Sequence, residues 1–207
     1  MADLFPETIE TDRLRLEATG PETVDVFELY EICSSDPGIE EVTAYVTWDP
    51  HPTPKETADH VERSADRFES NEAASYVIRP LEGEDGAEEI AGGAGCDVDW
   101  DRRTMTLGVW LRKRFWGRGY SGERAAAFMH VAFERLDLEV VAVLALVDND
   151  RSKRAIRKYT EAHGGGREGT LRNWQVIDGE PVDCVRYSVS RSEWRENPTD
   201  VTVCLEA

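Results

Sequence analysis

The chain has 207 residues, of which 42 are acidic and 24 basic, and its formal net charge at pH 7 is −18. This balance argues against a nucleic-acid partner, because binding to a phosphate backbone needs a basic surface. No apolar run approaches the ~20 residues that a membrane-spanning helix needs, and the four cysteines are scattered without a Cys-x-x-Cys pair. We therefore expect no membrane partner, no metal site and no disulfide framework.

The length fits one domain spanning residues 1–207, with 197–207 as a flexible tail. Acidic residues stand near the N-terminus where a signal peptide would carry positive charge, which predicts a cytoplasmic protein. An acidic surface on which arginine outnumbers lysine is typical of a halophile, whose high internal salt screens the repulsion between carboxylates.

The N-terminal half is predicted to alternate between short strands and helices. Leucines at alternating positions indicate a first strand, and a proline-rich loop at 47–54 separates two helical segments. The glycines of 91–95 predict a bulge or a close approach of two backbones. In chain order we expect a strand at 11–18, helices at 20–32 and 53–70, and strands at 74–80, 90–100 and 104–111.

From Ser121 the apolar residues change to a helical spacing. They recur at i, i+3, i+4, i+7, i+8 and i+11, as Ala125, Phe128, Met129, Ala132, Phe133 and Leu136. The run at 140–147 is apolar on both faces, as a central strand should be. A second helix is expected over 151–162, ending before three glycines, and two further strands are expected around an Asp178-Gly179 turn.

Between these parts, the stretch RFWGRGYSGE holds Gly117, Gly119 and Gly122 in the spacing G-x-G-x-x-G of a dinucleotide-binding turn. A dinucleotide fold places the first glycine directly after a strand and an acid at the end of the next strand, about 20 residues later. Here five residues separate Leu111 from Gly117, and the first acid after the next strand is Asp148, 31 residues away. The pattern therefore argues against NAD, although not against another phosphate.

Positive charge gathers around this loop. Residues 112–124 hold five basic side chains and residues 151–158 hold five more, so 10 of the 24 basic residues occupy 21 positions. In an acidic chain such clusters favour a small polyanionic ligand.

The stretch from Leu107 to Ile156 resembles the core of the GNAT N-acetyltransferases, in particular the RimJ/RimL-like branch. That family's acetyl-CoA motif reads Arg/Gln-x-x-Gly-x-Gly/Ala, which Arg114, Gly117 and Gly119 match. The similarity extends to ETDRLRL at 10–16, WDPHP at 48–52, NDRS at 149–152 and the segment at 167–194. The resemblance implies an α+β fold whose mostly antiparallel sheet is splayed between its fourth and fifth strands, with helices on both faces.

The resemblance also implies where acetyl-CoA would bind. The backbone near Trp110 and Leu111 would pair with the pantetheine arm, and the N–H groups from about Trp116 to Ser121 would hold the pyrophosphate at a helix N-terminus. Nearby arginines and the 151–158 cluster would neutralise the other phosphates. The cofactor-binding residues expected are Trp110, Leu111, Arg112, Arg114, Trp116, Gly117, Arg118, Gly119, Tyr120, Ser121, Asn149 and Lys158.

Acetyl transfer needs a donor to the developing oxyanion and a proton for the departing thiolate. The resemblance suggests a backbone N–H of the splayed strand as the oxyanion donor and Tyr159 as the acid. The alternative for Tyr159 is a core position beside Ala155 and Ile156. Ser152 is the second choice of acid, or else a helix-start hydroxyl. Asn149 would orient the pantetheine or the acceptor, or would only cap the helix.

Many GNAT enzymes carry a glutamate base on the fourth strand, whereas this chain has Thr106 at the corresponding place. His163 is expected to be a helix-end residue rather than a base, while Trp48 and His51 of the proline-rich loop are candidates for the acceptor side. A site without a strong base favours an acceptor that is partly neutral at pH 7. An α-amine is about one tenth neutral there and a lysine amine only about 0.04% neutral.

We therefore expect transfer to the N-terminal α-amine of a protein or to a small amine. The alternative is a catalytically silent acyl-CoA-binding module that acts as a sensor or interaction domain. The sequence leaves open whether two copies form a homodimer.

Overall fold

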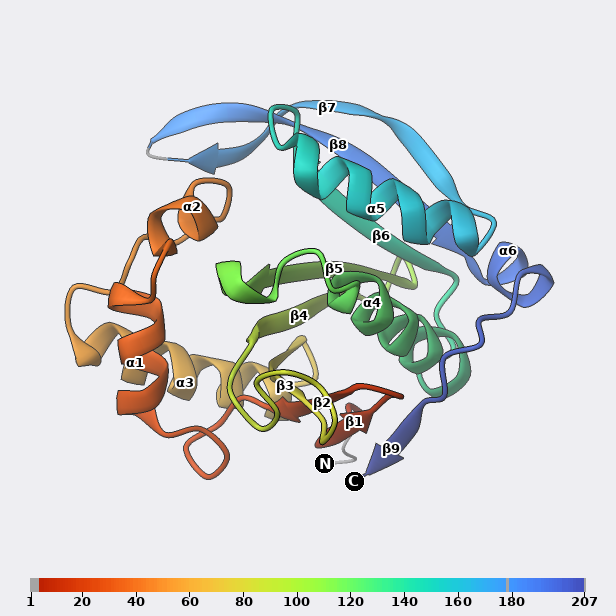
Figure 1. Ribbon diagram of the computed structural model, residues 1–207. Helices are drawn as coiled ribbons and strands as arrows, with labels where there is room; N and C mark the ends of the chain where they lie inside the picture. Colours follow the sequence, from red (N-terminus) through yellow and green to blue (C-terminus); the bar gives the residue numbers. More distant parts are fainter. Residues whose placement is uncertain (1–3, 178, 207) are drawn as a thin grey trace.

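The computed structural model describes residues 4–177 and 179–206, and these form one nine-stranded sheet with helices on both faces (Figure 1). The strands are β1 (Thr8–Glu10), β2 (Leu14–Ala18), β3 (Ala73–Pro80), β4 (Gly92–Asp99), β5 (Thr104–Leu111), β6 (Val140–Leu146), β7 (Gly166–Ile177), β8 (Glu180–Ser190) and β9 (Cys204–Glu206). The helices are α1 (Val26–Ser35), α2 (Ile39–Thr43), α3 (Pro54–Glu69), α4 (Tyr120–His130), α5 (Asp150–Ala162) and α6 (Arg191–Glu196). A 3-10 turn η1 (Lys113–Phe115) precedes α4, and a π-helical turn η2 (Val131–Arg135) follows it.

The strand order is β7-β8-β6-β5-β4-β3-β2-β1-β9, and neighbouring strands are antiparallel except for β5 and β6. These two strands pair in parallel only from Thr104 opposite Val140 to Leu107 opposite Val143. Beyond Leu107 they part, and β8 continues the sheet on the far side of β6. The predicted fold is thus confirmed. The splay lies between the fifth and sixth strands because the N-terminal segment forms two short strands.

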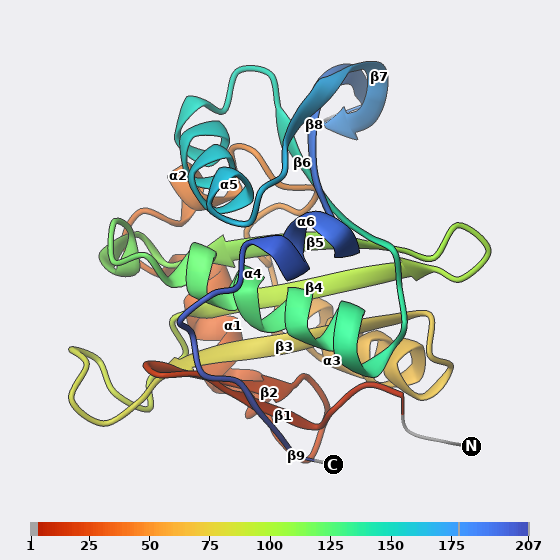
Figure 2. The same ribbon diagram turned by 90° about the vertical axis from the view of Figure 1, so that its right-hand side faces the viewer.

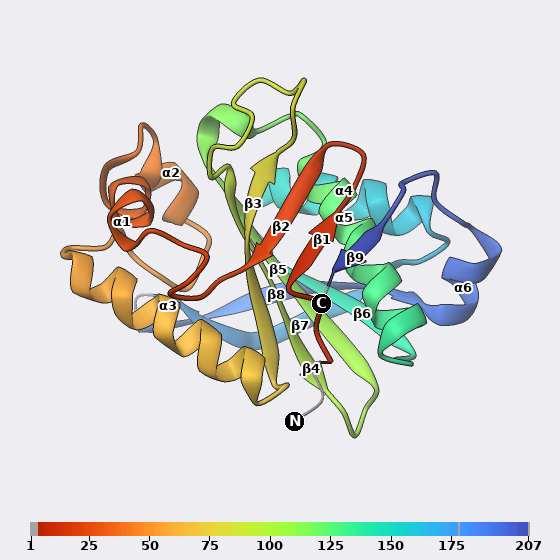
Figure 3. The ribbon, with the colours of Figure 1, turned by 90° about the horizontal axis from the view of Figure 1, so that it is seen from below.

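The helices divide between the two faces of the sheet. Helices α1 and α3 lie on one side, and α4 and α5 lie on the other (Figure 3). Helix α4 extends along its face in front of the central strands (Figure 2). The apolar residues predicted for α4, such as Ala125, Phe128 and Met129, are buried in the main core. Among the described residues, no helix is both long enough and apolar enough to cross a membrane.

Several elements differ from the prediction. Helix α1 begins at Val26 rather than at 20, because the Asp25 side chain accepts hydrogen bonds from the N–H groups of Phe27 and Glu28. The long helix predicted from Ser121 changes to π geometry at Val131. The expected tail contains β9, which pairs with β1, so 204–206 belong to the sheet. Of the predicted Asp178-Gly179 turn, Asp178 lies outside the described residues.

The predicted close approach at the glycines of β4 is present. A β-carbon at Gly92 would collide with the backbone of Trp110 on β5, and one at Gly93 would collide with the Trp110 indole. Glycine is needed at both positions because Trp110 lies tightly across β4 just where β5 leaves β6.

Candidate active site at the splayed strands

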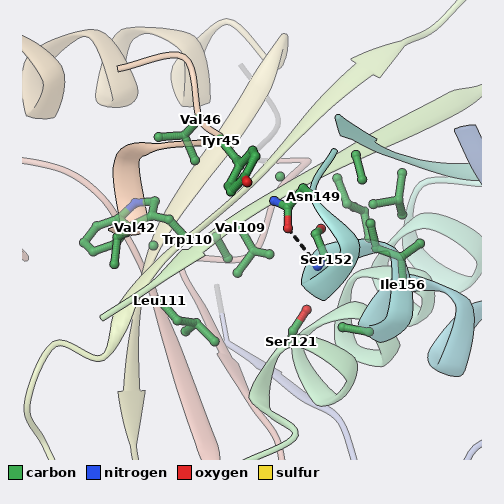
Figure 4. A pocket seen from close by; sticks show the side chains of 18 of the residues that line it. Val42, Tyr45, Val46, Val109, Trp110, Leu111, Ser121, Asn149, Ser152 and Ile156 are labelled. Carbon is green, nitrogen blue, oxygen red and sulfur yellow. Dashed lines mark hydrogen bonds between the residues drawn. The ribbon is translucent and has the colours of Figure 1, made fainter. Parts of the chain in front are cut away.

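A cleft of about 1440 Å³ opens where β5 and β6 part. The end of β5 and residues 143–146 of β6 form its two walls, and the N-termini of α4 and α5 close one side. The loop after α2 and the β7–β8 hairpin border the cleft elsewhere. In Figure 4 the side chains of Val109, Trp110 and Leu111 lie across the cleft from Asn149, the N-cap of α5, and from Ser152 in its first turn.

The glycine loop presents backbone donors at the N-terminus of α4. Gly117 and Gly119 both have positive φ, 80° and 86°, a conformation that side chains disfavour. The described residues supply no acceptor for the N–H groups of 117–121, and the first hydrogen bond of the helix is that from Gly122 to Gly119. Together with the helix dipole, these N–H groups make a site suited to an anion. Trp116, Gly117, Gly119, Tyr120 and Ser121 all line the cleft.

The arginines of the loop are not in the cleft, which differs from the prediction. Their guanidinium groups pair with carboxylates that do not line the cleft: Arg112 with Asp36 at 2.5 Å, Arg114 with Glu89 at 2.7 Å, and Arg118 with Asp85 at 2.6 Å. All three also lie 4.8–5.8 Å from the ring centroid of Phe115. They therefore brace the loop rather than line the cleft.

The positive charge of the cleft comes from α5 instead. Arg151, Arg154 and Lys158 line it, and of these Lys158 is one of the residues predicted to bind the cofactor. The Arg151 guanidinium lies 3.8 Å from the ring centroid of Trp116, which connects α5 to the glycine loop. A cation and an aromatic face at this distance attract each other.

Asn149 and Ser152 meet at the start of α5. The Asn149 side-chain oxygen caps the helix by accepting the N–H of Ser152 at 3.0 Å (Figure 4). Both residues line the cleft, and the cap holds the Ser152 backbone in place.

Tyr159 lies about two turns after Ser152 along α5, buried against the core but lining the cleft. Its hydroxyl has no hydrogen-bond partner among the described residues. Burial raises the pKa of Tyr159 to about 12, and the nearby Arg124 guanidinium opposes that rise. At neutral pH the hydroxyl is therefore protonated and able to donate.

The side of the cleft where the acceptor was predicted holds a histidine that the sequence analysis did not identify. Trp48 lines the cleft and packs against Trp110, with ring centroids 5.4 Å apart. His51 is not among the lining residues, and its Nδ1 lies 2.7 Å from the Thr57 hydroxyl. His60 of α3 does line the cleft, and burial lowers its pKa, so its imidazole is neutral at pH 7. Its spacing from the buried Thr57 and Ser64 was the signal that could have identified it.

Thr106 lines the cleft at the position where the family's glutamate was sought. Its cross-strand neighbour Asp97 also lines the cleft but pairs with Arg67 at 2.6 Å. His163 follows the C-terminal end of α5, outside the cleft lining. The described residues contain no group of histidines, cysteines and carboxylates that could hold a metal ion.

Comparison with known proteins places this geometry in a family. The model of the "Acetyltransferase (GNAT) domain" family matches residues 13–159. The putative ribosomal N-acetyltransferase YdaF of Bacillus subtilis is 33% identical over 98 residues, which cover 47% of this chain and 51% of YdaF. The match thus spans only about half of that relative.

Two solved structures have the same fold over most of their length. A putative acetyltransferase from T. thermophilus is 29% identical, with a TM-score of 0.72 and coverage of 93% of both chains. RimL, a ribosomal L7/L12 alpha-N-protein acetyltransferase solved with Coenzyme A, is 20% identical, with a TM-score of 0.71 and coverage of 86% of this chain and 94% of RimL. The chain belongs to the GNAT family, the acetyl-CoA-dependent N-acetyltransferases predicted from its sequence.

Proposed function

We propose that this protein acetylates α-amines, either the N-terminus of a polypeptide or a small amine of similar basicity. The observation that carries the proposal is that the described chain places no unpaired carboxylate beside Thr106, where Asp97 is held by Arg67. Without a carboxylate base at that position, the acceptor must reach the thioester already neutral, and at pH 7 an α-amine does so far more often than a lysine amine. The name of YdaF, a putative ribosomal N-acetyltransferase, supports a polypeptide acceptor.

Acetyl-CoA would lie along the free edge of β5, with its pyrophosphate on the N–H groups of 117–121. The family relationship and the open backbone donors of that loop support this placement. Arg151, Arg154 and Lys158 would neutralise phosphate charge from the α5 side. A backbone N–H of β5 beyond Leu107, where pairing with β6 ends, would donate to the oxyanion.

We assign the proton donor to Tyr159. Its hydroxyl is buried, protonated and without a partner in the described chain, so it is available for the leaving thiolate. Tyr159→Phe removes that proton and keeps the ring, and it should lower kcat by about 10²- to 10⁴-fold with little change in acetyl-CoA affinity. Ser152→Ala is the paired variant. A large loss there and none at Tyr159 would transfer the role to the serine.

The acceptor would enter on the side of Trp48 and His60. A neutral imidazole there is suited to take the proton that the amine loses on attack. His60→Gln should therefore slow transfer while leaving acetyl-CoA binding unchanged.

Release of CoA with a panel of amines and peptides tests the proposal against its alternatives. Turnover with α-amine acceptors is the expected result. Binding of CoA with no turnover on any acceptor would favour a silent binding module instead. A melting temperature that rises with NAD but not with CoA would contradict both the acetyltransferase and the silent binding module.

A further inference from the structure

Helix α4 carries a fully buried arginine that the acetyl-CoA site does not use. Arg124 is 0% exposed, and its Nη1 donates a long hydrogen bond, 3.3 Å, to the carbonyl oxygen of Gly108. Its Nε and Nη2 atoms are buried without a partner among the described residues. A buried guanidinium that is so poorly satisfied is strongly disfavoured unless another group compensates for it.

No carboxylate of the described chain compensates Arg124. Its neighbour Glu123 is directed away and pairs with Arg13 at 2.5 Å. The chain has 42 acidic residues, yet none of those that the structure describes forms an ion pair with Arg124. A group that is neutral at rest and becomes negative during the reaction would compensate it.

The titratable groups that interact with Arg124 are Tyr159 of α5 and Cys96 of β4. Burial raises the pKa of the Cys96 thiol to about 12, so it stays neutral. Helices α4 and α5 approach closely here, since a β-carbon at Gly122 would lie 3.6 Å from the Cβ of Tyr159. Arg124 and Tyr159 therefore interact across these helices, while the Tyr159 hydroxyl and the Arg124 Nε and Nη2 atoms lack a hydrogen bond of good geometry among the described residues.

We propose that Arg124 is a positioning residue that stabilises the phenolate formed when Tyr159 gives its proton to the CoA thiolate. The inference rests on the proton-donor role proposed for Tyr159. When the amine has attacked and the C–S bond breaks, the phenolic proton passes to sulfur and leaves a negative oxygen beside the guanidinium. The proton lost by the amine nitrogen, taken up by His60 and passed on through water, then restores the phenol, so the balance is acetyl-CoA plus amine to amide plus CoA thiol.

The acidities explain why such a partner is needed. An ordinary thiol has a pKa of about 8.5, well below the value of about 12 for Tyr159. The value for Tyr159 already includes the lowering by the Arg124 guanidinium, so proton transfer from the phenol to the thiolate would be still more unfavourable without it. A fixed cation beside the phenolic oxygen provides that stabilisation of the phenolate without reorganising.

A purely structural role is the competing explanation, because Arg124 also holds the Gly108 carbonyl at the point where β5 leaves β6. The two explanations differ in one respect. If Arg124 acts through the phenolate, its removal matters only while Tyr159 carries a hydroxyl. If it only holds the backbone, its removal matters equally with or without that hydroxyl.

Four proteins test this: wild type, Arg124→Met, Tyr159→Phe and the double variant, each assayed for kcat at saturating acetyl-CoA and α-amine peptide. Methionine fills similar space without a charge, and melting curves and CoA affinity monitor the fold. We expect Arg124→Met to lower kcat by about 10- to 100-fold in the presence of Tyr159, and by less than about two-fold in the Tyr159→Phe background. An equal loss in both backgrounds would overturn the inference while leaving the proton donor in place.

The remaining outcomes are also decisive. Unchanged turnover in Tyr159→Phe would overturn both the proton donor and the role of Arg124, whereas a wild type inactive on every amine would contradict the proposed function itself. If Arg124→Met does not fold, Arg124→Lys takes its place. Lysine should retain activity at pH 7 and lose it at a lower alkaline pH than wild type, because a buried ammonium loses its proton and a guanidinium does not. Superimposable pH profiles would contradict the inference.

Discussion

Arg151 of α5 lies with its guanidinium 3.8 Å from the ring centroid of Trp116, and this contact joins the two elements that would hold the acetyl-CoA phosphates. It fixes the cation at the cleft wall, next to the open N–H groups of the glycine loop. The loop's own arginines are engaged with carboxylates, so Arg151 carries charge that they do not supply.

Arg151→Gln should weaken CoA binding by about 10- to 100-fold, because it removes both the contact with Trp116 and a phosphate partner. Isothermal titration with CoA measures the change. Arg157→Gln is the matched control on the same helix, since Arg157 is outside the cleft lining. Equal losses in the two variants would mean a general effect of charge rather than a contact at the site.

Gly92→Ala should destabilise the fold by about 1–3 kcal/mol, since the new methyl group would collide with the Trp110 backbone. Because Trp110 lines the cleft, CoA binding should weaken as well. Gly95→Ala on the same strand is the control, because its methyl group would make only ordinary contacts at 3.6 Å. Urea unfolding compares the two, and equal stabilities would show that β5 can move away from β4.

Stability should fall as the pH drops from 7 to 5. Burial lowers the pKa values of His51, His60 and His163 in the folded chain. The unfolded chain therefore takes up protons near pH 6.5 while the folded chain does not, and this favours unfolding as the pH falls through that value. Carboxylates such as Asp85 and Asp137, whose pKa values are lowered by arginine partners, act only at more acidic pH.

Urea unfolding at pH 8, 7, 6 and 5 measures this dependence. His163→Gln should flatten it in part, because His163 lies away from the cleft and its removal leaves the site intact. A free energy of unfolding that stays constant or rises between pH 7 and 5 would contradict the lowered pKa values of the three histidines.

The net charge of −18 predicts a rise in melting temperature with salt. In molar KCl the Debye length falls to about 3 Å, so repulsion between surface carboxylates is screened. Exposed pairs such as Lys55–Asp59 are weakened too, but each of them contributes little. A melting temperature that is flat or falls between millimolar and molar KCl would contradict the halophile prediction.

The order of the elements around the site could be predicted from the sequence, because it depends on local patterns. The helical spacing after Ser121, the run at 140–147 and the glycine stop after Ala162 are each readable without tertiary contacts. The splayed sheet was predicted only from the resemblance to the GNAT family, because no local sequence pattern indicates it.

The side-chain partners could not be predicted, because they come from distant segments. Arg112 is engaged by Asp36, 76 residues earlier, and nothing near either residue predicts that pairing. The basic residues of the loop therefore suggested phosphate binding, whereas the basic residues that line the cleft belong to α5. Arg124 did carry a signal, since it precedes Phe128 by four residues on the face that packs into the core.

The most direct test of the account is the position of the acetyl group on a peptide that has both a free N-terminus and one internal lysine. With acetyl-CoA at pH 7, mass spectrometry should find the acetyl group on the α-amine, and the same peptide with a blocked N-terminus should react much more slowly. About one tenth of α-amines and only about 0.04% of lysine amines are neutral at that pH, and the described cleft holds no unpaired carboxylate beside Thr106 to compensate. Preferential acetylation of the lysine would contradict the account, as would equal rates for the two peptides.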